Sequence, residues 1–165
     1  MAFTKTTLQY ATQLTVTEIL AGNVEGLSDK TVKHTGYNRA EKLDADSTVP
    51  VTLVATFSIP LIAGAETIDL NALVGTNDLA IDGEGLKVQA VKFSNPVGNG
   101  AMTITFGAGT PYLLMGAAWK VILLAGQEFV FFGNDATPDI ETGVASDIDL
   151  AGTLIEELEV QIVMG

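Results

Sequence analysis

Apolar and polar residues alternate over short stretches of this chain, and glycine, asparagine, aspartate and proline interrupt the alternation frequently. A period of two predicts strands with one buried face, whereas a helix repeats its apolar positions every three to four residues. In the clearest run, which ends at Pro60, one face is predicted to consist of Val51, Leu53, Ala55, Phe57 and Ile59. We therefore predict an all-β protein with little or no helix.

Two tight connections are predicted farther along the chain. In residues 86–90 the apolar positions Leu86, Val88 and Ala90 alternate with Lys87 and Gln89. Residues 95–100 then contain Asn-Gly, which favours positive φ, so a hairpin over 86–106 is expected. A turn at 125–128 predicts a second hairpin over 119–132, in which Trp119, Val121 and Leu123 lie on the face opposite to Lys120 and Ile122. Residues 158–164 predict a last strand with one solvent-exposed face.

The first part of the chain has a different texture. A strand is predicted over 14–20, and the polar stretch 22–47 suggests an extended excursion with a short strand near 31–35. We expect residues 1–47 to form an N-terminal strand and arm-like region and residues 48–165 to form the β-sandwich core. About eight strands with uneven loops favour two packed antiparallel sheets, jelly-roll-like by preference, with an immunoglobulin-like sandwich as the alternative.

Composition narrows the classes of partner. The 165 residues include 20 acidic and 8 basic residues, for a net charge of −12, and no cysteine. Such a charge repels nucleic acids and anionic membranes, so neither is expected as a partner. The first residues lack the pattern of a secretory signal, and the apolar stretch 111–126 is too short to span a bilayer and contains Lys120. Export by the secretory route is therefore not expected, and production in the cytoplasm is.

Charge is also distributed unevenly. Residues 1–42 hold five basic and four acidic residues, whereas residues 133–165 hold eight acidic and no basic residues. Basic groups of one copy are therefore expected to attract acidic groups of a neighbouring copy. The basic residues assigned to this interface are Lys30, Lys33, Arg39 and Lys42.

Only 17% of the residues are charged, below the roughly 25% that is usual for soluble domains. This favours some apolar surface at an interface, and the alternative is a well-filled sandwich core in a monomer. Aromatic side chains dominate both cores and subunit contacts. The aromatic residues assigned to one or the other are Trp119, Phe129, Phe131 and Phe132.

Signs of catalytic chemistry are weak. The single histidine, His34, lies in a polar stretch without a Gly-x-Ser-x-Gly elbow, and an exposed strand position is expected for it. Acidic pairs such as Asp82 with Glu84, or Asp147 with Asp149, arise by chance among twenty acids. Neither of the two glycine-rich nucleotide-binding motifs occurs. We expect no catalytic residues and no cofactor.

One loop has the composition of a weak calcium site. Its oxygen ligands would be Asn77, Asp78, Asp82 and Glu84. The spacing does not match an EF-hand, and a solvated turn between strands is the preferred interpretation. A weaker candidate consists of Asn134, Asp135 and Asp139.

Four segments carry a resemblance to a known family: AGAETIDL at 63–70, GEGLKVQ at 83–89, AGQEF at 125–129 and LEVQIVMG at 158–165. In their turn-and-strand texture they resemble the small β-sandwich virion proteins of tailed bacteriophages, of the head decoration or cement type. The resemblance implies a jelly-roll-like module, often trimeric, that clamps neighbouring capsid subunits with an N-terminal arm.

The expected function is therefore non-enzymatic: a capsid decoration protein that stabilises the phage head from the capsid exterior. It is expected to be a homo-oligomer, with a trimer favoured, and to bind the major capsid protein. The alternative is a carbohydrate- or receptor-binding module of a fibre or spike, with contact loops at 77–85 and 134–139. A third hypothesis, a calcium-assisted hydrolase, has the least support from the residues.

Overall fold

A computed structural model describes residues 7–12, 16–20, 30–34, 39–75 and 79–165 of the chain. These residues form strands, turns and a single short stretch of 3-10 helix, Ile62–Gly64. The prediction of an all-β protein with little or no helix is confirmed. The short repeat length of the apolar positions explains this result, because alternation buries one face of a strand but no face of a helix.

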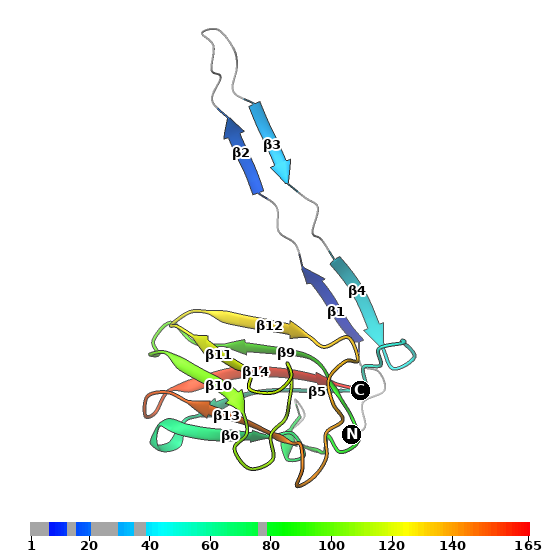
Figure 1. Ribbon diagram of the computed structural model, residues 1–165, viewed down its shortest axis with the longest axis vertical. Helices are drawn as coiled ribbons and strands as arrows, with labels where there is room; N and C mark the ends of the chain where they lie inside the picture. The colour runs from blue at the N-terminus through cyan, green and yellow to red at the C-terminus, as the bar shows by residue number, and fades with distance from the viewer. Residues whose placement is uncertain (1–6, 13–15, 21–29, 35–38, 76–78) are drawn as a thin grey trace.

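Two four-stranded antiparallel sheets face each other (Figure 1). Sheet I has the order β12 (Glu128–Phe132), β9 (Val88–Ser94), β14 (Glu157–Met164) and β5 (Leu53–Pro60). Sheet II has the order β11 (Lys120–Leu123), β10 (Met102–Phe106), β13 (Asp147–Ala151) and β6 (Ala65–Asp69). The chain passes from one sheet to the other at nearly every connection, which is the jelly-roll arrangement of two Greek keys.

Both predicted hairpins are wrong. Strand β9 pairs with β12 and β14 in sheet I, whereas β10 pairs with β11 and β13 in sheet II. The turn at 125–128 likewise leads from β11 in sheet II to β12 in sheet I. Turn residues specify a reversal of the chain, but the reversed strand can pair with its predecessor or cross to the opposite sheet. Here the strands cross, and each apolar face is buried between the sheets.

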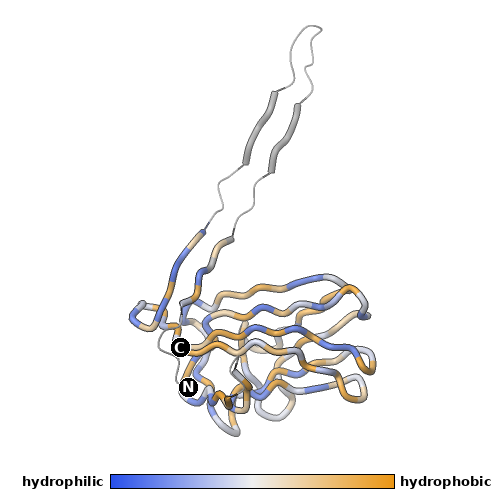
Figure 2. The backbone as a smooth tube through the Cα atoms, turned by 180° about the vertical axis from the view of Figure 1, so that it is seen from behind, coloured by the Kyte–Doolittle hydropathy of each residue, from blue (hydrophilic) through white to orange (hydrophobic). Residues whose placement is uncertain are grey.

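The inner faces of the two sheets form the main core. The largest fully buried side chains include Phe93, Ile104, Tyr112, Ile148 and Ile162. In β14 the predicted alternation is confirmed, because Leu158, Val160 and Ile162 are buried while Glu157 and Glu159 are exposed. Figure 2 shows the same pattern as hydrophobic colour running along the strands of both sheets.

The face assignment for residues 86–90 needs correction. Val88 belongs to the main core between the sheets, but Ala90 lies on the outer face of sheet I. Gln89 is fully buried. The pairing of β9 with β14 shifts register between Val163 and Met164. Such an irregularity changes the face on which the following residues lie, so simple alternation fails there.

A two-stranded arm projects from the sandwich (Figure 1). Its first part pairs β1 (Thr7–Thr12) with β4 (Arg39–Asp44), and its second part pairs β2 (Val16–Leu20) with β3 (Lys30–His34). Strands β2 and β3 lie where the sequence predicted strands over 14–20 and near 31–35, although Leu14 and Thr35 lie outside the described residues. A short additional pair joins β7 (Leu73–Val74) to β8 (Ala80–Ile81).

The arm is attached through a second apolar cluster, which lies on the outer face of sheet I and which we call the anchor cluster. It consists of Leu43, Val49, Val51, Ala90 and Val163, with Leu8, Val54 and Phe132 packed against it. Leu8 and Leu43 come from β1 and β4, whereas Ala90 and Val163 come from β9 and β14. Sheet I is therefore covered on both faces near the arm, which explains why Val163 is buried.

Candidate functional site: the arm and the loop end

The base of the arm makes a polar and aromatic contact with the sandwich next to the anchor cluster. The Arg39 guanidinium lies 5.4 Å from the centroid of the Phe132 ring, and its Nη2 donates a 3.4 Å hydrogen bond to Asn134 Oδ1. Within β4, Arg39 Nη2 also forms an ion pair with Glu41 at 2.6 Å. Arginine over an aromatic face is a favourable cation–π contact. Two residues predicted to meet a partner protein thus meet each other inside one chain.

The other basic residues predicted at an interface follow the arm. Lys42 is exposed on β4. Lys30 and Lys33 belong to β3, and their side chains lie outside the described residues. His34 is the last residue of the same strand, so the predicted strand position is confirmed. Its predicted exposure stays a prediction, because its side chain also lies outside the described residues.

Trp119 belongs to the main core of the chain. Its side chain is 6% exposed, and its Nε1–H donates a 2.9 Å hydrogen bond to the carbonyl of Tyr112. Phe129 and Phe131 are half-buried and pack against the main core, whereas Phe132 packs against the anchor cluster. Of the two alternatives that the sequence left open for these aromatic residues, the described contacts support a packing role within the chain.

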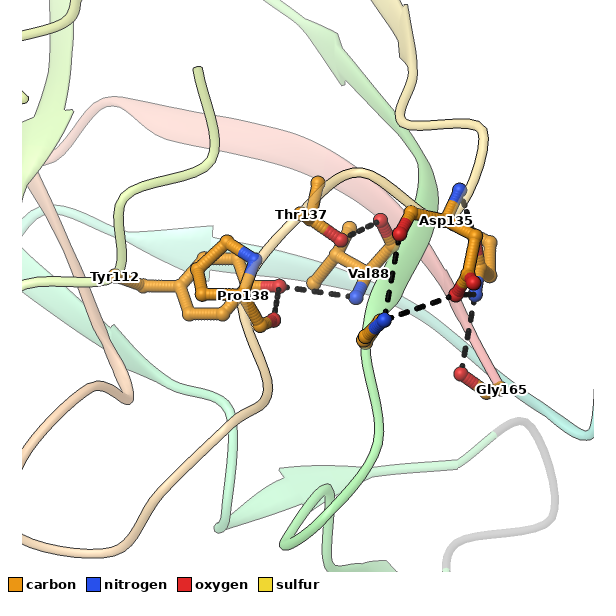
Figure 3. Close-up of polar contacts among 8 residues, drawn as sticks. Val88, Tyr112, Asp135, Thr137, Pro138 and Gly165 are labelled. Atoms are coloured by element: carbon orange, nitrogen blue, oxygen red, sulfur yellow. Dashed lines mark hydrogen bonds and ion pairs between the residues drawn. The ribbon is translucent and has the colours of Figure 1, made fainter. Parts of the chain in front are cut away.

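A buried polar network fastens two loops to the first residue of β9 (Figure 3). The Tyr112 hydroxyl accepts a 3.0 Å hydrogen bond from the Val88 N–H and donates a 2.9 Å bond to the Pro138 carbonyl. Thr137 Oγ1 donates to the Val88 carbonyl at 3.0 Å. Burial raises the pKa of the Tyr112 phenol above its ordinary value. A neutral hydroxyl that bonds two backbone groups holds the 137–138 segment and Tyr112 against the start of β9.

The same network continues to the end of β14. Gln89 Nε2 donates hydrogen bonds to Asp135 Oδ1 at 3.2 Å and to the Gly165 carbonyl at 3.1 Å. Hydrogen bonds from Gln89 and then from Lys87 lower the pKa of Asp135. The buried Gln89 therefore has its amide satisfied, which removes the cost of burying it. This explains how a polar residue is tolerated within sheet I.

Of the candidate calcium ligands, the two that the structure describes, Asp82 and Glu84, accept hydrogen bonds from other groups of the chain. Asp82 Oδ1 accepts a 3.0 Å hydrogen bond from the Glu84 N–H, and Glu84 Oε2 accepts hydrogen bonds from both the N–H and the hydroxyl of Thr142. Asn77 and Asp78 lie outside the described residues. Among the residues that the structure describes, no group of three or more His, Asp or Glu residues is arranged to hold a metal ion.

The second calcium candidate is also tied to neighbouring residues. Asn134 accepts the hydrogen bond from Arg39, and Asp135 is bonded to Gln89 and forms an ion pair with Lys87 at 3.3 Å. Asp139 is exposed. These contacts give Asn134 and Asp135 a structural role in closing the 133–139 loop against β9 and the arm.

The outer face of sheet I carries a polar groove of about 460 Å³. Its polar side chains are Thr56, Ser58, Lys92, Ser94, Glu159 and Gln161. Lys92 forms an ion pair with Glu128 at 2.7 Å, and the hydrogen bond from Lys92 lowers the pKa of Glu128. Lys92, the only basic side chain among the described residues that line the groove, is thus paired with an acidic residue beside it.

A surface that the sequence did not reveal lies at the end of the sandwich away from the arm (Figure 1). Four connections meet there, 61–64, 95–101, 124–127 and 152–156, and we call them the loop end. Their exposed apolar side chains are Ile62, Val97, Leu124, Leu154 and Ile155. A signal was present in the sequence, because Glu156 is the single charged residue in these four segments. It could not be recognised before the fold brought the segments together.

Comparisons with protein-family models, with curated proteins and with solved structures found no match to the chain. In the described part of the chain, no helix is long and apolar enough to cross a membrane. The molecule is therefore characterised by its own geometry: a jelly-roll sandwich with an anchored two-stranded arm at one end and an apolar loop end at the other.

Proposed function

We propose that this chain is a non-enzymatic structural protein of a virion, a decoration protein that stabilises the head of a tailed bacteriophage from outside. The observation that carries the proposal is the arm, a two-stranded ribbon that leaves the sandwich and is fixed to it by a dedicated apolar cluster. The four strands of the ribbon contact chiefly one another, as the pairs β1–β4 and β2–β3, so the ribbon adds little to the packing of the sandwich. Such a segment suits contacts with neighbouring subunits.

The charge distribution supports the same role. The arm is close to neutral, whereas the remaining chain carries most of the net charge of −12. Arm segments can therefore approach the acidic body of another subunit without strong repulsion, and the exposed Lys42 on β4 favours that approach. On a lattice, many weak contacts repeated by symmetry supply the strength of binding. The proposed partners are further copies of this chain, with a trimer favoured, and the major capsid protein.

The test uses assembled phage heads from the source of the chain and a variant with a shortened arm. Residues 13–38 are replaced by Asn-Gly, which closes a tight turn where Thr12 pairs with Arg39 and leaves the anchor cluster in place. The full-length protein is expected to co-sediment with the heads, and the shortened protein is expected to lose most of this binding while keeping its melting temperature.

The opposite results would decide against the proposal. A full-length protein that ignores heads but binds defined glycans on an array would favour the fibre or spike module instead. Equal binding of the full-length and shortened proteins to heads would show that the arm is not the clamp. A chelator added to the array would report on any contribution of calcium.

A further inference from the structure

The four connections of the loop end are braced to one another by hydrogen bonds. The Gly152 N–H donates to the Gly64 carbonyl at 2.9 Å, and the Leu61 N–H donates to the Glu156 carbonyl at 2.8 Å. On the other side, the Gly126 N–H donates to the Asn95 carbonyl at 2.8 Å. Loops fixed in this way present a defined surface and not a set of independent tips.

The carboxylate of Glu156, the only acidic residue of the loop end, takes part in these hydrogen bonds between loops. Glu156 Oε1 accepts a 2.6 Å hydrogen bond from the Gly100 N–H, and Oε2 accepts a 3.2 Å bond from the Thr153 N–H. Two nearby acids outside the loop end are also engaged, since Glu128 pairs with Lys92 and Glu157 accepts a hydrogen bond from Ser58. The loop end is thus an apolar surface with its neighbouring acids engaged, on a strongly acidic molecule.

Ile155 has a backbone conformation that its side chain disfavours. Its φ is +72°, in the left-handed region that glycine and asparagine tolerate, and a β-branched residue there is a clear outlier. The side chain is 82% exposed, so packing within the chain does not compensate for the strain. Strain of this kind is characteristic of functional surfaces.

We infer that the loop ends of two or more copies of this chain pack against one another around a shared symmetry axis. The proposed function supplies the occupant, because the protein then works as several copies, and the charges favour the loop end as the surface where those copies meet. Copies with a net charge of −12 repel each other, and the loop end is an exposed apolar surface whose one acid is held by backbone amides. The size is suitable, because the four loops approach the roughly 20–30 residues that each side of a standard interface provides.

This inference rests on the proposed function in one respect, which is that several copies of the protein work together. It assigns the contact between copies to the end opposite the arm, which leaves the arm available for the shell. An uncharged apolar surface can meet its own copy across a two-fold axis or neighbouring copies around a higher axis, and both arrangements give a closed oligomer.

The test compares Ile155→Asn with a matched control, Val144→Asn, in full-length protein by sedimentation equilibrium. Val144 is 60% exposed and lies in the 133–146 connection, outside the loop end. Asparagine tolerates the left-handed region, so Ile155→Asn is expected to keep or raise the melting temperature while weakening self-association at least about tenfold. Val144→Asn is expected to associate like the unchanged protein.

Salt provides an independent readout. Raising sodium chloride from 0.05 to 0.5 M is expected to strengthen association, because it screens repulsion between acidic copies and leaves apolar contact intact. Association through attraction between arm and body would weaken instead. The inference is overturned by a strict monomer at all concentrations, by equal effects of the two variants, or by weakening in salt. Head binding by the arm is measured separately, so the two proposals fail independently.

Discussion

Arg39 of the arm lies over the ring of Phe132 of the sandwich, with 5.4 Å between the guanidinium carbon and the ring centroid. This contact joins β4 to the end of β12, next to the anchor cluster to which Phe132 also belongs. The arm is therefore held by one apolar and one charged contact at its base. The direction in which it leaves the body depends on both.

Arg39→Ala and Phe132→Leu should show energetic coupling. The guanidinium is partly exposed, so the cation–π contact is expected to contribute about 0.5–1 kcal/mol. A double-mutant cycle in urea denaturation measures this coupling. Arg39→Lys keeps the charge but loses the planar stacking, and we expect it to retain only part of the coupling. A coupling of zero would mean that the two side chains are neighbours without mutual stabilisation.

Leu43→Ala should loosen the arm without unfolding the sandwich. Leu43 is 8% exposed in the anchor cluster, which is separate from the main core. Hydrogen exchange is expected to accelerate in β1 and β4, while the amides of β14 stay protected. The matched change Leu158→Ala, in the main core, should instead lower the global free energy of unfolding by about 2–5 kcal/mol. If the amides of β1 and β4 and those of β14 lost protection equally after Leu43→Ala, the anchor cluster would not be independent of the main core.

Tyr112→Phe should destabilise the fold by about 1–3 kcal/mol, because the buried Val88 N–H and Pro138 carbonyl lose their partner. Urea denaturation near pH 7 measures this change. Phenylalanine fills nearly the same volume, so packing is preserved. An unchanged free energy of unfolding would show that water or another group replaces the hydroxyl.

Tyr112 also predicts a pH dependence. Burial raises the pKa of the phenol in the folded state, so the unfolded chain loses this proton at lower pH than the folded protein. The resulting stability is fully present below about pH 10 and is lost as the pH rises through the folded-state pKa. Between pH 9 and 11.5 the unchanged protein should therefore lose more stability than Tyr112→Phe. Parallel curves for the two proteins would argue against a buried phenol.

Gly107→Ala and Gly109→Ala should differ although they are two residues apart. A Cβ at Gly107 would collide with the Cβ of Asp147 and lie 2.9 Å from the Asp147 carbonyl oxygen, whereas nothing lies within 4 Å of a Cβ at Gly109. Thermal unfolding should show a loss of about 1–3 kcal/mol for Gly107→Ala. Gly109→Ala should be neutral or slightly stabilising, because it restricts the unfolded chain. Similar effects at both positions would disprove the close approach of β13.

Local pattern was sufficient to predict the class of fold and most strand positions. Residues 119–123 show why: Trp119 and Leu123 are buried, and Lys120 and Ile122 are exposed, as the alternation predicted. The buried face of a strand is specified by side chains two positions apart, and these are neighbours in the sequence. The same logic failed at Gln89, where a register shift with β14 made a polar residue a buried hydrogen-bonding partner.

What the sequence determined by itself is the alternation that makes strands, the acidic character of the body and the absence of cysteine. Only the tertiary structure decided which strands pair, because pairing depends on how two apolar faces cover each other and not on the turn between consecutive strands. It also placed Arg39 against Phe132 and gathered Ile62, Val97 and Ile155 at one end. These contacts join residues that are distant along the chain, so no local pattern could specify them.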